Sequence, residues 1–167
     1  MNELAGEAAG APAESGLPES VREVPVPPEP RILVVSSDTA EARAVARGLA
    51  RAGTRAAAVS PGEVAAWDEA IVQAVDVFVV VAAVLDDPQM ALLERIRERS
   101  PTAEIVVVSP DPAVEDTVQA VRAGVHSVLR APALPDELAL EVTKALARRR
   151  WAKQRLRVLA RVQGSGR

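Results

Sequence analysis

The segment RILVVSSDTAEA (31–42) decides the fold, because four apolar residues in a row pass directly into a helical pattern. The run at 32–35 is typical of a strand that is buried on both faces. Between strand and helix the sequence places Ser36 and Ser37, where an acid-rich tip would be able to hold a metal or a phosphate. The segment therefore raises the question of whether this fold carries chemistry at all.

Apolar runs alternate with helical patterns from residue 31 onward. Strands are expected over 31–35, 55–59, 75–82, 104–109 and 126–131, and helices over 38–53, 61–74, 87–100, 112–124 and 135–162. Asp38 or Thr39 is placed to cap the first helix, and Gly53 to end it. The alternation predicts an α/β fold: a doubly wound five-stranded parallel sheet, flavodoxin-like in order 2-1-3-4-5, with an extended C-terminal helix.

Composition excludes several classes of function. The chain has no cysteine, so disulfides, zinc–thiolate sites and cysteine nucleophiles are ruled out. It contains neither a dinucleotide-binding glycine motif nor a P-loop motif. No apolar stretch approaches the ~20 residues of a membrane helix, and the start of the chain lacks the pattern of a signal peptide. A cytoplasmic location is expected.

Charge is distributed unevenly along the chain. The net charge is −3, but residues 1–30 hold six Glu against one Arg, and residues 145–167 hold eight bases and no acid. The first of these segments is rich in Ala, Gly and Pro without helical or strand periodicity, which predicts a disordered leader.

Three segments resemble the receiver domain of bacterial two-component response regulators, the CheY-like fold: ILVVSSD, VDVFVVV…LLERIRERSPTAEIVVVS and AVRAGVHSVLRAPALPDEL. They place a receiver-like domain at 31–148, followed by a basic helical extension and a flexible end at 149–167. The resemblance implies phosphoryl transfer to an aspartate at the tip of the third strand. It also implies Mg²⁺ held by acids after the first strand.

Most positions that carry this chemistry in the family have lost it here. The acidic pair falls on Ser36 and Ser37, the phosphoacceptor on Val81, the lysine on Ala131, the hydroxyl on Ser109 and the proline on Pro132. A valine offers no nucleophile, an alanine no charge, and serines are poor Mg²⁺ ligands. We therefore expect a degenerate pocket that cannot be phosphorylated. The protein is expected not to be an enzyme and to have no catalytic residue, metal or cofactor.

The alternative is a Mg²⁺-dependent phosphorylatable regulator, or one that binds a small ligand, using Asp38 with Asp86 or Asp87. Asp38 lies at the right end of the first strand for a weak cation ligand. Asp86 and Asp87 are equally well explained as the N-cap and first-turn acid of the next helix.

The last helical pattern continues beyond the expected end of a receiver. Its apolar stripe in steps of three and four is interrupted at Arg149 and surrounded by bases. We expect it to mediate homodimerisation; the predicted interface is Leu138, Val142, Trp151, Leu156 and Leu159. Contact with an anionic membrane or with nucleic acid is a less favoured reading of the same helix.

The predicted function is a pseudo-receiver: a phosphorylation-independent interaction and dimerisation module in bacterial signal transduction, acting on a protein partner or a downstream output domain. Receiver-like domains of this kind precede pilus-localising ATPases of the TadZ/CpaE type, diguanylate cyclases and histidine kinases. The sequence does not choose among these settings.

Overall fold

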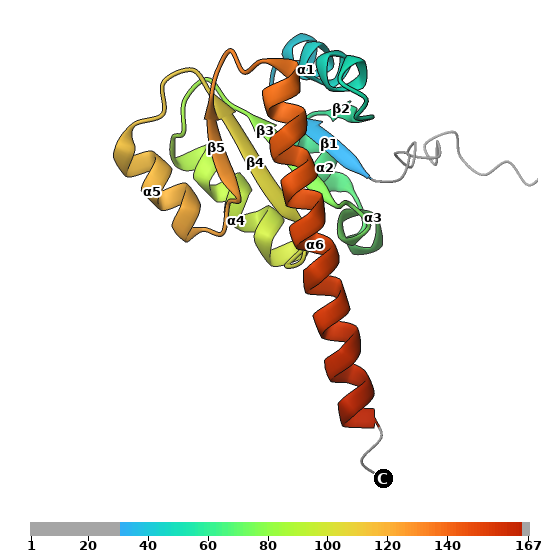
Figure 1. The fold of residues 1–167 in the computed structure, drawn as a ribbon. Coiled ribbons are helices and arrows are strands. Elements are labelled where there is room, and N and C mark those ends of the chain that lie inside the picture. Colours follow the sequence, from blue (N-terminus) through green and yellow to red (C-terminus); the bar gives the residue numbers. More distant parts are fainter. Residues whose placement is uncertain (1–30, 165–167) are drawn as a thin grey trace, which may run out of the picture.

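The computed structural model describes residues 31–164. In chain order its elements are β1 (Ile32–Val35), α1 (Thr39–Arg51), β2 (Ala57–Val59), α2 (Pro61–Ala66), α3 (Glu69–Gln73), β3 (Val77–Val81), α4 (Asp87–Arg99), β4 (Glu104–Ser109), α5 (Val114–Arg122), β5 (Ser127–Arg130) and α6 (Pro135–Gly164). All strand pairs are parallel, in the order β2-β1-β3-β4-β5 (Figure 1). The predicted sheet is confirmed; the predicted leader (1–30) lies outside the described residues.

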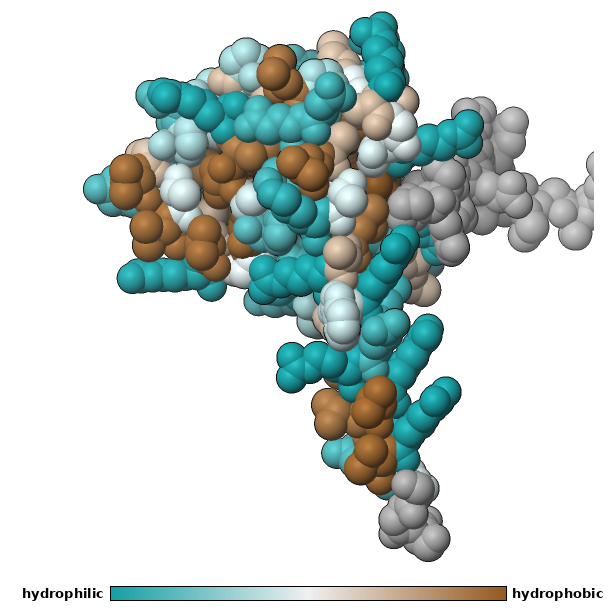
Figure 2. Space-filling model, viewed as in Figure 1, coloured by the Kyte–Doolittle hydropathy of each residue, from teal (hydrophilic) through white to brown (hydrophobic). Residues whose placement is uncertain are grey.

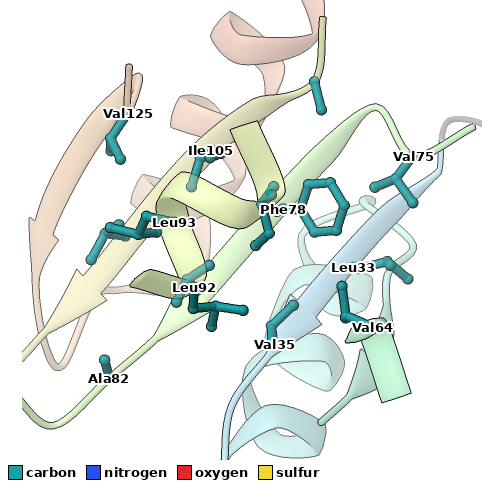
Figure 3. Packing of buried hydrophobic residues seen from close by; sticks show 14 of the residues in the cluster. Leu33, Val35, Val64, Val75, Phe78, Ala82, Leu92, Leu93, Ile105 and Val125 are labelled. Atoms are coloured by element: carbon teal, nitrogen blue, oxygen red, sulfur yellow. The ribbon is translucent and has the colours of Figure 1, made fainter. Parts of the chain in front are cut away.

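Helices cover both faces of the sheet because alternate residues of its central strands point to opposite sides. On β3, Val77, Val79 and Val81 pack in one cluster with α1 and α6. Phe78 and Val80 pack in the other, with α2, α3, α4 and α5. Phe78 is fully buried and lies in the middle of this second cluster (Figure 3). Both faces of the sheet are therefore core, as its uninterrupted apolar runs predict.

The single helix predicted over 61–74 is wrong, since the structure has two short helices there. The backbone of Trp67 is extended, and its ring is half-buried against the core. Arg99 of α4 donates to the carbonyl oxygen of Val64 at 2.9 Å and to that of Trp67. These bonds add a side-chain donor at the carboxyl end of α2, where, among the described residues, the Val64 carbonyl otherwise accepts only the Trp67 N–H at 3.4 Å. A contact from a distant part of the chain thus overrides the local helical pattern.

A buried ion pair fixes α6 to the base of the sheet. Arg149 is 2% exposed, and its Nε donates to Asp76 Oδ1 at 2.6 Å. Its Nη1 donates to Thr102 Oγ1 at 2.9 Å and its Nη2 to the carbonyl oxygen of Gln73 at 3.1 Å. Asp76 also accepts the backbone N–H of Arg31 at 3.0 Å. The network joins the segments before β1, β3 and β4 to α6.

The ion pair also marks where α6 leaves the body. The sequence analysis assigned Arg149 to the extension, whereas the structure places it inside the folded body. From Arg150 to Gly164 every side chain is exposed except that of Ala152, which is half-buried. This segment, the α6 extension, projects away from the sheet as a continuation of the same helix (Figure 1). No helix within residues 31–164 is both long enough and apolar enough to cross a bilayer.

The ion pair predicts a large effect for Arg149→Ala, because the substitution leaves Asp76 mostly buried without its main cationic partner. We expect a loss of about 3 kcal/mol in the free energy of unfolding, measured by urea denaturation. The matched control is Arg150→Ala, one residue on and exposed, for which we expect a change within about 0.5 kcal/mol. Equal, small losses in both variants would show that the ion pair does not anchor the helix.

Candidate functional site

The carboxyl ends of β1, β3, β4 and β5 meet at one edge of the sheet, and the loop after β1 is fully engaged in local hydrogen bonds. Ser36 is buried; its Oγ accepts the Asp38 N–H and donates to Glu41 Oε2, both at 3.1 Å. Asp38 Oδ1 accepts the N–H groups of Ala40 at 2.9 Å and Glu41 at 3.2 Å. Asp38 is therefore the N-cap of α1, and Ser37 is exposed beside it.

The end of β3 carries no polar group. Val81 is 5% exposed and lies in register with Val108 of β4. Val80 and Ala82, on either side of it, are buried in the opposite cluster. Shifting the alignment with the receiver family by one residue in either direction therefore does not bring a carboxylate to the tip of β3.

The tips of β4 and β5 carry a buried hydroxyl and an exposed ion pair, in which Arg130 Nη2 donates to Asp111 Oδ1 at 2.8 Å. Ser109 is fully buried, and its hydroxyl has no hydrogen-bond partner within the described part of the chain. Its carbonyl oxygen accepts the backbone N–H of Ala131 at 2.8 Å. The peptide bond between Ala131 and Pro132 is cis. Ser109 and Pro132 thus occupy the places that the sequence analysis gave them, and the charge of Arg130, in register with Ser109, is paired with Asp111.

An apolar cavity of about 390 Å³ lies between α1, the tips of β3 and β4, and the start of α6. Val81 and Val108 line it from the sheet, Val45 from α1 and Pro132 from the loop after β5. Glu41 is the one ionisable residue that the structure places in its lining. An apolar wall cannot replace the hydration of a phosphoryl anion, so the cavity does not favour phosphate.

The remaining acids do not form a metal site. Asp86 is the N-cap of α4, with its Oδ1 accepting the Gln89 N–H at 3.2 Å, and Asp87 is the first residue of that helix. Among residues 31–164, no three His, Cys, Asp or Glu side chains converge on a position that could hold a metal ion. With Asp38 used as a cap as well, these residues do not fit the Mg²⁺ that a phosphorylatable receiver requires.

No protein-family model and no curated protein matches the sequence. Solved structures do match. A pilus assembly-related protein from Burkholderia pseudomallei is 27% identical with a TM-score of 0.63, over 71% of this chain and 90% of that one. A protein assigned to pilus assembly (CpaE) from Burkholderia thailandensis is 28% identical with a TM-score of 0.60, over 70% and 98%. A CheY-like receiver domain from Methanospirillum hungatei is 22% identical with a TM-score of 0.61, over 73% and 97%.

The chain has a CheY-like receiver fold. Two of the five residues predicted for an interface on its last helix, however, belong to the core. Leu138 and Val142 are 3% and 0% exposed and pack under the sheet, so the prediction was wrong for these two. They belong to the half of α6 that covers β3 and β4, and a partner cannot reach them. Trp151, Leu156 and Leu159 are more than half exposed, and their role in an interface stays a prediction.

Sequence reasoning missed two features of this receiver fold, a hydrogen bond and a pair of exposed valines. Glu41 was not connected with Ser36, because nothing in their spacing announces the hydrogen bond. Val158 and Val162 were left out of the apolar stripe, although both are exposed on the α6 extension. The signal for the valines was present, since they lie four residues apart and hence on one side of a helix. Figure 2 shows apolar side chains gathered on this projecting end of α6.

The role of Asp38 as a cap predicts that its charge is dispensable. Asp38→Ala should lower the free energy of unfolding by about 1 kcal/mol, whereas Asp38→Asn, which keeps an acceptor oxygen, should lower it by less than about 0.5 kcal/mol. Adding Mg²⁺ should leave the Tm of all three proteins unchanged. A Tm that rises with Mg²⁺ in the wild type and fails to rise in Asp38→Asn would identify Asp38 as a cation ligand.

Proposed function

We propose that this chain is an atypical receiver that cannot be phosphorylated and that acts as a protein-interaction module in bacterial signal transduction. The observation that carries the proposal is the buried Val81 at the end of β3. Phosphoryl transfer in a receiver needs a solvated, ionised carboxylate at that position, and a valine packed against Val108 supplies neither charge nor access.

Two further losses support the same conclusion independently. Ala131 places a methyl group where a receiver's lysine would neutralise the phosphoryl group. The hydroxyl of Ser36, at one position of the acidic pair, donates to Glu41 and is buried. Without phosphate or metal to bias two conformations, the fold is expected to stay in one of them.

The setting that the comparisons favour is pilus assembly. Two similar structures, at 27% and 28% identity, are of proteins assigned to that process, whereas the receiver domain at 22% supports the fold alone. We therefore place the module in a pilus-assembly system, in the cytoplasm, where it would act on a partner protein or an output domain. Its proposed contact surface is the α6 extension, because this is the part of α6 that the described body leaves uncovered.

Loss of phosphotransfer predicts no response to small phosphodonors. Incubation with acetyl phosphate and Mg²⁺ should leave the intact mass unchanged, and beryllofluoride with Mg²⁺ should not alter the tryptophan emission of the chain. A receiver domain with the complete acidic set, treated in parallel, is the positive control. A Mg²⁺-dependent mass increase of one phosphoryl group, mapped to any aspartate, would refute the proposed function.

A further inference from the structure

The α6 extension continues an apolar stripe, here called the seam, along which α6 packs on the body. Within the body the seam consists of Leu138, Val142, Ala145 and Arg149, which follow one another in steps of four, three and four and are all buried. The same steps lead on to Ala152, Leu156 and Leu159 in the extension. Apolar residues alternating in steps of three and four are the pattern by which helices pack on other helices. The seam thus continues where no described residue covers it.

The exposed part of the seam is wide and strongly apolar. Leu156 and Leu159 are 55% and 56% exposed, and Trp151, Val158 and Val162 beside them are 68%, 59% and 67% exposed. Figure 2 shows apolar side chains clustered on this projecting helix, separated from the body by polar ones. Large apolar side chains gathered on one short segment mark an interaction surface, whereas scattered single ones do not.

A second side of the extension is strongly basic. Arg150, Lys153, Arg157 and Arg161 follow one another in steps of three and four, which places them on one side of the helix. Arg155 lies within the apolar side, one turn from both Trp151 and Leu159. No acidic residue occurs from 145 to 167. The extension therefore offers an apolar seam flanked only by positive charge.

This charge argues against a second copy as the occupant of the seam. When two helices pack, the residues that flank the seam of one helix lie beside those of the other, and opposite charges there select the partner. Lys153 Nζ lies 3.6 Å from Asp76 Oδ1 of its own chain, so Arg155 carries the argument. In a pair of identical extensions Arg155 would meet only bases, because this segment contains no acid. Like charges at such short separations repel, so the homodimer predicted from sequence is disfavoured by electrostatics.

Two other occupants fit the surface less well. Nucleic acid would bind the basic side through its phosphates and leave the apolar seam in water. In a membrane interface the apolar side of a helix enters the lipid, and Arg155 interrupts that side here. The regular continuation of the seam from the body into the extension points instead to another helix.

We propose that the α6 extension binds an acidic amphipathic helix of a partner protein, with Leu156 and Leu159 at the centre of the contact. Such a helix would cover the apolar seam and place carboxylates beside Arg155. The proposal rests on the proposed function as an interaction module and names the chemistry of its partner.

The test uses the full chain and two synthetic helical peptides with identical leucine seams, one flanked by Glu and one by Lys, followed by fluorescence anisotropy. We expect the Glu peptide to bind roughly tenfold or more tightly than the Lys peptide, with an affinity that falls as salt rises. Leu156→Gln with Leu159→Gln should weaken binding by roughly tenfold or more. Val114→Gln, which changes a still more exposed apolar residue on α5, should not.

Charge reversal sharpens the result. Arg155→Glu with Arg157→Glu should move the preference toward the Lys peptide, while circular dichroism confirms that α6 stays helical. Equal binding of both peptides, or none, overturns the proposal.

A dimer in light scattering that dissociates in the double Gln variant would assign the seam to a second copy. A shift of tryptophan emission on anionic vesicles alone would assign it to a membrane. None of these outcomes bears on the acetyl phosphate result, so the two proposals fail separately.

Discussion

The buried pair of Arg149 and Asp76 is the interaction on which the functional geometry depends. Taking both charges out of water is costly, and here the cost is offset by partners on all three guanidinium nitrogens and by a second donor to the carboxylate. A buried pair of this kind adds little net stability compared with apolar packing. It does fix the position of α6 along the sheet, because no other register of the helix places Arg149 against Asp76. The direction of the α6 extension follows from that register.

At the opposite end of the sheet, apolar groups stand where a receiver has charges. Several carboxylates gathered at one edge repel one another and raise one another's pKa values. Val81 removes that repulsion and lets the core that α1 and α6 share with the sheet reach the last residue of β3. The apolar packing of this edge is what the proposed loss of phosphotransfer rests on. Glu41 remains at the cavity, engaged with Ser36 rather than with a ligand.

The sequence predicts what is local and misses what joins distant segments. The strands follow from their apolar runs, and the caps Asp38 and Asp86 from their places before helical patterns. The break at Trp67 depends on Arg99, more than thirty residues away, and no local pattern contains it. Helical spacing placed Leu138 and Leu159 on one stripe but could not say which half the sheet covers. The position of Arg149 could have been interpreted from sequence, because a charge within an apolar stripe needs a buried partner. The sequence analysis did not make that inference.

One helix, α6, connects the apolar edge of the sheet with the exposed extension. Leu138 lines the cavity beside Val81, and the same α6 passes Arg149 and continues to Leu159 without a break. In a fold that switches, such a connection would carry a change at the sheet edge to the far end of the helix. Under the proposed function the edge does not change, and the buried pair holds the helix in one register. The body would then support α6, and regulation would act at the extension, through the concentration of a partner or the ionic conditions under which it binds.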